Sequence, residues 1–215
     1  MTKRIGRQTP TKSKILPFKK TLSNEAIELY QKSKRTAYEW QKNLLDAILA
    51  VNDEELWVHM KFGFSVPRQN GKNEVVAMRE LIGLEKGERI LHTAHRTTTS
   101  GTAFNRLLSI MEDCGYEEGE DFTKIKAIGR ESIVMKDGGK IDFRTRTSTG
   151  GLGESFDLLV IDEAQEYTDD QESALKYTIA ASPNPQTILI GTPPTPISSG
   201  TVFTNLRNAT LEGNN

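Results

Sequence analysis

A glycine and a lysine, Gly71 and Lys72, stand where a segment rich in aromatic and β-branched residues gives way to one with helical spacing. Backbone N–H groups at the start of a helix carry partial positive charge, so a glycine-containing loop at this point can surround a phosphate group. The lysine can neutralise the phosphate charge. The pattern predicts a phosphate-binding loop made of Arg68, Gln69, Asn70, Gly71, Lys72 and Asn73.

This loop departs from the usual Gly-x-x-x-x-Gly-Lys-Ser/Thr motif at two positions. Val66 replaces the first glycine, and Asn73 replaces the hydroxyl residue that normally binds magnesium. An amide oxygen can also bind magnesium, so Asn73 is a candidate metal ligand. Taken alone, the segment fits equally well an ordinary glycine turn that opens a helix and leaves Lys72 on the surface.

Two adjacent carboxylates, Asp162 and Glu163, directly follow the short apolar segment 158–161. A continuous apolar run of this length is typical of a strand buried on both faces, and open parallel sheets bind ligands at the carboxyl ends of their strands. We expect Asp162 to bind magnesium there and Glu163 to act as the catalytic base that polarises the attacking water. The alternative is that the two acids cap a following helix.

Another apolar segment, 187–190, ends in the sequence Gly-Thr-Pro-Pro at 191–194. If 187–190 is a strand of the same sheet, Thr192 lies in the same crevice as the carboxylates. Its hydroxyl would then be a sensor that hydrogen-bonds the γ-phosphate or its bound water. On its own, this tetrapeptide is an ordinary turn.

The segments that must position these groups alternate between strand and helix patterns. This order predicts an α/β fold with a central, mostly parallel sheet flanked by helices. Between 115 and 147, two alternating segments joined by Asp-Gly-Gly predict an inserted β-hairpin. The predicted strands are 57–66, 89–94, 158–161 and 187–190, and the predicted helices are 23–33, 36–51, 74–84 and 97–114.

Length and composition favour a single domain in a reducing cytoplasm. The chain has 215 residues and one cysteine, which excludes an internal disulfide. No apolar run approaches the about 20 residues of a membrane span, so no membrane contact is expected. The net charge of −1 gives no overall attraction to nucleic acid. Residues 1–22 predict a flexible basic arm, because residues 1–20 hold seven Lys or Arg and no acid; the domain is expected at 23–215.

Together, the motifs at 68–72, 159–164 and 191–194 resemble those of the ATPase domain of tailed-phage large terminase subunits. The resemblance covers residues 38–207 and is specific in these motifs and loose between them. In that family the phosphate loop often lacks its first glycine and carries an arginine, so Val66 and Arg68 fit. The resemblance implies a P-loop NTPase fold of the RecA-like, ASCE class, with ATP and Mg²⁺ as cofactors and hydrolysis of ATP to ADP and phosphate.

The family resemblance also implies two further groups of site residues. Gln41 is similar in position to a residue that contacts adenine, and Trp40 or Tyr38 would stack on the base; Trp40 is equally compatible with a core residue. A basic residue from a neighbouring subunit would complete the site, and Arg146 is the first candidate and Arg144 the second. A strand-end arginine bonded to a local carboxylate or to DNA is the competing interpretation. Arg68, acting within its own subunit, is a third candidate.

Large terminases drive viral double-stranded DNA into a preformed capsid. The resemblance therefore implies DNA, the portal protein and the small terminase subunit as partners, and the host cytoplasm as location. It also implies a homo-oligomeric ring, expected to be a pentamer when assembled, with a monomer possible in isolation. The family's nuclease of RNase H-like fold is a separate C-terminal domain. Since the chain stops at Asn215, we expect no nuclease activity in it.

Two other functions remain open at this point. Asp162-Glu163-Ala164-Gln165 is similar to the Asp-Glu-x-His/Gln/Asp strand end of helicases, which favours a helicase-like, DNA-dependent ATPase. Helicases of that type need two RecA-like domains in one polypeptide, and a chain of this length holds one. The second alternative is a nucleotide-gated binding module with little turnover, for which Asn73 is the best argument.

Overall fold

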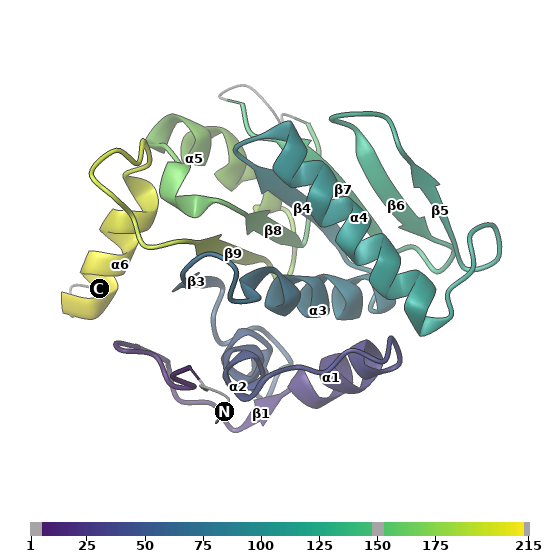
Figure 1. Cartoon of the computed structure of the whole chain (residues 1–215), viewed down its shortest axis with the longest axis horizontal. Helices are drawn as coiled ribbons and strands as arrows, with labels where there is room; N and C mark the ends of the chain where they lie inside the picture. The colour runs from purple at the N-terminus through teal and green to yellow at the C-terminus, as the bar shows by residue number, and fades with distance from the viewer. Residues whose placement is uncertain (1–5, 148–152, 213–215) are drawn as a thin grey trace, which may run out of the picture.

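The computed structural model describes residues 6–147 and 153–212, and every structural statement below concerns these residues. Residues 1–5 of the predicted arm lie outside them. The chain is built on a seven-stranded sheet with the strand order β3-β9-β8-β4-β7-β6-β5 (Figure 1). The strands are β3 (Lys61–Ser65), β4 (Arg89–Ala94), β5 (Phe122–Ile125), β6 (Glu131–Met135), β7 (Lys140–Thr145), β8 (Leu158–Ile161) and β9 (Gln186–Gly191).

The five strands from β3 to β7 in this order run parallel to their neighbours, whereas β6 runs antiparallel to both β7 and β5. The hairpin predicted between 115 and 147 therefore forms and extends the main sheet, because β7 pairs in parallel with β4. This architecture confirms the predicted α/β class with a mostly parallel central sheet.

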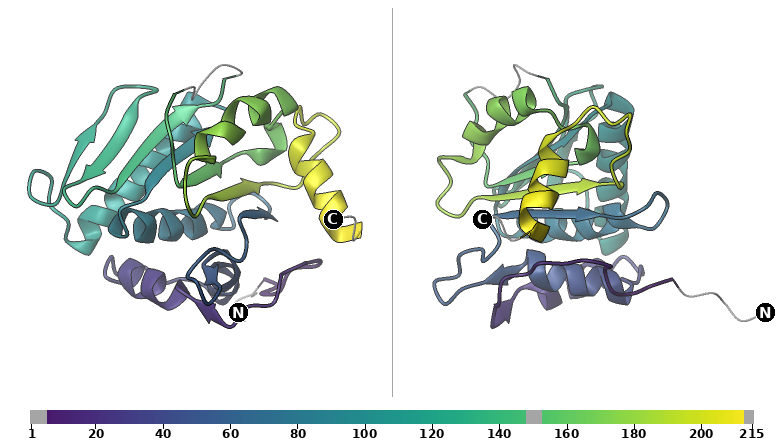
Figure 2. Two further views of the ribbon diagram at one scale, coloured as in Figure 1. Left: turned by 180° about the vertical axis from the view of Figure 1, so that it is seen from behind. Right: turned by 90° about the vertical axis from the view of Figure 1, so that its left-hand side faces the viewer.

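Helices cover both faces of the sheet. One face carries α3 (Lys72–Glu85) and α4 (Thr97–Cys114), and α1 (Ser23–Gln31) and α2 (Glu39–Ile48) pack on the outside of α3 (Figure 2). The opposite face carries two short 3₁₀ segments together with α5 and α6. Helix α6 lies at the β3 end of the sheet. These elements are η1 (Ala164–Glu166), α5 (Asp169–Leu175), η2 (Lys176–Ile179) and α6 (Val202–Glu212).

Strand β8 shows how the apolar sequence fills both layers. Leu158 and Val160 lie in the core beneath α1 to α4, and Leu159 and Ile161 lie in the core on the opposite face. Successive side chains of a strand point to opposite faces, so a strand covered on both sides needs apolar residues at every position. This burial fixes the place of the two carboxylates that follow.

The N-terminal region differs in detail from the sequence-based boundaries. The predicted helix 36–51 ends earlier, because residues 50–51 leave it to form β2 (Ala50–Val51), which pairs with β1 (Lys20–Thr21). Trp57 bridges to Val51, so the main-sheet strand begins only at Lys61. The boundary at residue 22 and the flexibility of the arm stay predictions. Within the described residues, no helix combines the length and the apolar character that crossing a membrane requires.

Candidate active site

Three neighbouring strands bring the predicted motifs to one edge of the sheet. The loop 66–71 follows β3, the two carboxylates follow β8, and Thr192 follows β9, which lies between these strands. Ser65 is in register with Gly191, and Ile161 with Leu189, so all three strands end at about the same level. Because parallel strands place their carboxyl ends on the same side, segments about 90 residues apart meet here.

The loop itself has the backbone that an anion site requires. Gly71 has φ +79°, a left-handed conformation that favours glycine, and Lys72 begins α3 directly after it. No side chain caps this helix start, and the Glu74 N–H donates to the Gly71 carbonyl oxygen at 3.2 Å. The N–H groups of Lys72 and Asn73 are left for a ligand. Asn70 Nδ2 donates to the carbonyl oxygens of Pro67 and Arg68, at 3.2 Å and 2.9 Å, which closes the loop.

The exposure of the loop residues suits a ligand that arrives from solvent. Arg68, Gln69 and Asn70 are exposed, whereas Lys72 and Asn73 are half-buried. The Arg68 side chain forms no hydrogen bond or ion pair with any residue that the structure describes, so it is available to a ligand at the loop.

Gln41 lies under the loop and is 2% exposed. Its Oε1 accepts the Tyr38 N–H at 2.7 Å, and its Nε2 donates to the Gly71 carbonyl oxygen at 2.9 Å. Both polar groups of the amide are therefore used to join the start of α2 to the phosphate loop. Trp40 packs against the core and Tyr38 is exposed. The adenine contact of Gln41 stays a prediction.

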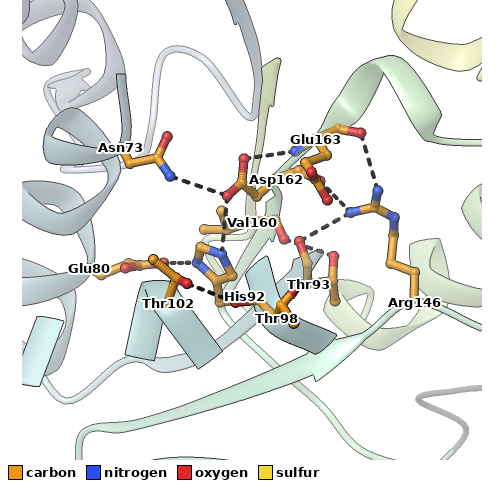
Figure 3. A network of polar contacts seen from close by, with 10 residues as sticks. All are labelled: Asn73, Glu80, His92, Thr93, Thr98, Thr102, Arg146, Val160, Asp162 and Glu163. Carbon is orange, nitrogen blue, oxygen red and sulfur yellow. Dashed lines mark hydrogen bonds and ion pairs between the residues drawn. The ribbon is translucent and has the colours of Figure 1, made fainter. Parts of the chain in front are cut away.

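The acidic pair is held by its own backbone and by Asn73 in the first turn of α3 (Figure 3). Asp162 is 1% exposed, and its Oδ1 accepts the Glu163 N–H at 2.7 Å. Asn73 Nδ2 donates to Asp162 Oδ2 at 3.4 Å, which is the direct contact between the phosphate-loop helix and the acidic strand end. The two predicted metal ligands, Asp162 and Asn73, are thus brought together.

Glu163 adopts a left-handed backbone conformation, with φ 53° and ψ 46°. For a residue other than glycine such a conformation costs on the order of 1–3 kcal/mol, and it occurs preferentially at functional sites. Its Oε2 is buried and has no hydrogen-bond partner among the described residues. A carboxylate oxygen left unpaired at a strand end is the arrangement expected of a base that accepts a proton from bound water.

The Arg146 side chain is buried within its own subunit and is 6% exposed. Its guanidinium donates to the backbone carbonyl oxygens of Thr93, Asp162 and Glu163 (Figure 3). Burial lowers its pKa to about 10, so the group is charged at neutral pH. This placement does not favour the predicted role of Arg146 in the site of a neighbouring subunit. Arg144 pairs with Asp142 and Glu154, as the competing interpretation of a locally bonded arginine describes.

Thr192 is half-buried at the end of β9, and its N–H donates to Gln165 Oε1 at 3.1 Å. Gln165 is itself buried in η1, just after the acidic pair. Its side chain therefore connects the ends of β8 and β9. In the sequence, Gln165 was considered only as the last residue of the helicase-like motif Asp162-Glu163-Ala164-Gln165. That motif was the signal that could have identified Gln165 as a residue of the site.

Two further residues that sequence reasoning missed lie behind Asp162. His92 in β4 and Glu80 in α3 are both buried, and His92 Nδ1 lies 2.5 Å from Glu80 Oε1 (Figure 3). The other ring nitrogen, Nε2, lies 4.0 Å from Asp162 Oδ2. The available signal was a histidine within an otherwise apolar strand pattern. These contacts place a titratable group next to the proposed metal ligand.

His92 is expected to titrate above the ordinary histidine range. Burial by itself would lower its pKa, but the carboxylates of Glu80 and Asp162 outweigh burial and raise it above 6.5. Protonated His92 therefore stabilises the fold at low pH, and this stabilisation is lost as the pH rises through the raised pKa. NMR titration of the imidazole resonances should show His92 above 6.5 and His59, whose pKa is lowered by burial, below it. A His92 pKa below that of His59 would contradict this assignment.

The fold is shared with solved structures of phage large terminases. The large terminase of HK97 bacteriophage has a TM-score of 0.71 at 15% identity, over 90% of this chain and 42% of that protein. The large terminase ATPase domain of Thermus phage P74-26 has a TM-score of 0.54 at 15% identity, over 81% of this chain and 71% of that domain. The large terminase of a thermophilic bacteriophage in complex with ADP has a TM-score of 0.51 at 9% identity, over 81% and 39%.

No protein-family sequence model and no curated protein sequence matches this chain. The chain spans less than half of the length of the HK97 protein and of the ADP-bound protein. At these identities the likeness concerns the fold. The chain therefore shares its fold with large-terminase ATPase domains, which agrees with the fold that the sequence predicted.

Proposed function

We propose that this chain hydrolyses ATP to drive double-stranded viral DNA into a preformed capsid, as the ATPase domain of a large terminase. The observation that carries this proposal is the meeting of three strand ends: the phosphate loop after β3, the acidic pair after β8 and Thr192 after β9. The shared fold supports it, and one of the neighbours with this fold was solved in complex with ADP.

In this proposal, ATP binds through the loop and the start of α3. Lys72 neutralises the β- and γ-phosphates, and the free N–H groups of the helix start surround them. Arg68, exposed in the loop, is the candidate cation of its own subunit for the γ-phosphate. Gln41 keeps the loop in place through its bond to the Gly71 carbonyl.

A magnesium ion that the protein and ATP bind jointly fits the same site. Among the described residues, no three His, Cys, Asp or Glu side chains cluster closely enough to hold a metal by themselves. Mg²⁺ is commonly held by one or two protein oxygens together with substrate phosphates, and the adjoining Asp162 and Asn73 side chains supply such a pair. The ion would neutralise charge that develops on the transferred phosphoryl group.

Glu163 then acts as the catalytic base. Its unpaired Oε2 would accept a hydrogen bond from the attacking water and polarise it toward the γ-phosphate. The Thr192 hydroxyl would sense the γ-phosphate and, through the Gln165 contact with its backbone, connect this event to the turn after β8. Binding, hydrolysis and sensing would thus use adjacent strand ends.

The partners implied by this function are double-stranded DNA, the portal protein, the small terminase subunit and further copies of the chain. A pentameric ring in the host cytoplasm is the proposed assembly, in which a basic residue from a neighbouring subunit completes each site. The basic residues 3–20 give the chain a local cationic segment despite its net charge of −1, and such a segment favours a polyanionic partner.

Phosphate release from ATP tests the proposed function. With Mg²⁺ and double-stranded DNA we expect phosphate release whose rate per chain increases with protein concentration. Omission of Mg²⁺ should abolish this release. Unwinding of a DNA duplex would favour the helicase-like alternative. Tight ATP binding without phosphate release at any protein or DNA concentration would contradict the proposal and favour the nucleotide-gated module.

A further inference from the structure

We propose that Arg146 is a positioning residue of its own site: by holding the backbone carbonyls on either side of the Glu163 α-carbon, it sets the conformation from which Glu163 presents its carboxylate. This inference rests on the proposed function of Glu163 as the base. It gives Arg146 a role within its own subunit in place of one in a neighbouring subunit.

The guanidinium joins the ends of three adjacent strands. Arg146 directly follows β7, and its own N–H donates to the Ala94 carbonyl oxygen at the end of β4, at 2.9 Å. Its side chain extends past β4 to β8, because β4 lies between these strands. Nη1 donates to the carbonyl oxygens of Thr93, at 3.1 Å, and Asp162, at 2.5 Å. Nη2 donates to the Glu163 carbonyl oxygen at 3.2 Å.

These acceptors lie where the ladder between β4 and β8 stops. The Asp162 N–H still donates to the Thr93 carbonyl oxygen, at 2.8 Å, and beyond this bond the chain turns into η1. The Asp162 carbonyl at this point needs a donor from elsewhere, since a buried carbonyl without one is costly. Arg146 supplies that donor and thereby fixes the peptide between the two acids.

The conformation that Arg146 holds is an unfavourable one. Glu163 has φ 53°, which the surrounding structure must maintain because residues other than glycine seldom adopt it. The side chain leaves the backbone in a direction set by φ and ψ, so a return to the extended conformation would turn the Glu163 carboxylate away. The bond from Nη2 to the Glu163 carbonyl acts directly on this turn.

The guanidinium is also held from its other side. Its carbon lies 5.5 Å from the centre of the Tyr167 ring, at the end of η1, in a cation–π arrangement. The group is buried against backbone carbonyls and an aromatic ring, with no side-chain ion pair among the described residues. A side chain enclosed in this way cannot extend to another subunit without losing all of these contacts.

The first test separates binding from turnover with Arg146→Gln and Arg146→Lys. We expect nucleotide affinity within about threefold of wild type and a kcat lowered at least tenfold, because only the presentation of the base changes. Arg146→Lys keeps the charge, but its single nitrogen cannot occupy the positions of both Nη1 and Nη2, so the bonds to the Asp162 and Glu163 carbonyl oxygens cannot both keep their present geometry. This variant should fold and still be slow. Lys140→Ala, at the opposite end of β7, is the matched control and should keep wild-type kcat. A folded Arg146→Lys chain with wild-type kcat would overturn the inference.

The second test mixes two impaired chains, Arg146→Ala, which binds ATP and hydrolyses it slowly, and Lys72→Ala, which does not bind it. If Arg146 acted in a neighbouring site, Lys72→Ala subunits would supply it to the intact nucleotide sites of the Arg146→Ala chain, and mixing would restore hydrolysis. A residue that acts within its own chain gives no restoration, which is the expected result. Restored turnover in the mixture overturns this inference and leaves the proposed ATPase function intact. A wild-type chain that binds ATP and never hydrolyses it overturns the proposed function and this inference together.

Discussion

Replacement of Glu163 by glutamine is expected to leave ATP binding intact and to lower hydrolysis by about two orders of magnitude or more. Glutamine has the size of glutamate but cannot take a proton from the attacking water. Its backbone N–H still donates to Asp162, so the strand end keeps its shape. Single-turnover hydrolysis and ATP affinity, measured on the same preparation, check both halves of this prediction.

Glu166→Gln is the control for this experiment. Glu166 lies three residues further on in η1, and its carboxylate accepts bonds from the N–H and the hydroxyl of Ser199. We expect this variant to hydrolyse ATP at nearly the wild-type rate. If Glu163→Gln also does so, Glu163 is not the base.

Replacement of Lys72 by alanine is expected to abolish detectable nucleotide binding. The Lys72 ammonium group supplies the positive charge that faces the β- and γ-phosphates at the start of α3. Without it, the backbone N–H groups leave most of the negative charge of the phosphates uncompensated. Calorimetric titration with ATP and Mg²⁺ measures the effect. The removal of one half-buried lysine should leave the fold intact, which thermal unfolding of the variant checks.

Lys86→Ala serves as the matched control, because Lys86 follows the last turn of the same helix and pairs there with Glu25. It should bind ATP like the wild type. Wild-type affinity in the Lys72→Ala chain would show that the loop is an ordinary helix-opening turn, which is the alternative that the broken motif allowed.

Patterns along the chain predicted the fold because its segments are strongly periodic or continuously apolar. The helix 97–114 and the strands 89–94 and 158–161 were predicted with the bounds observed. The rule that parallel strands bind ligands at their carboxyl ends was enough to place the phosphate loop beside the acidic pair. The same rule could not show that β7 pairs with β4, since strand order depends on contacts between distant segments.

The details of the site could not be predicted for the same reason. The family resemblance implied a role for Arg146 in a neighbouring subunit, whereas the structure turns its side chain across β4 toward carbonyls that a sequence does not display. Gln41 was assigned to adenine, and here both of its polar groups bond to backbone. The pairing of His92 with Glu80 depends on which face of α3 meets β4. Each depends on side-chain direction in three dimensions.

Strand β8 has one further consequence for the alignment of the site. Its four residues are all apolar and both of its faces are buried, so hydrophobicity alone does not distinguish the observed pairing from one displaced by a residue. The polar residues at its ends must make that distinction. Asp157 exchanges two bonds with the backbone of Arg89 and accepts a third from Ser182, while Arg146 holds the opposite end. Asp157, which precedes β8 at the end away from the acidic pair, thus helps to keep the strand ends that carry the proposed catalytic groups in register.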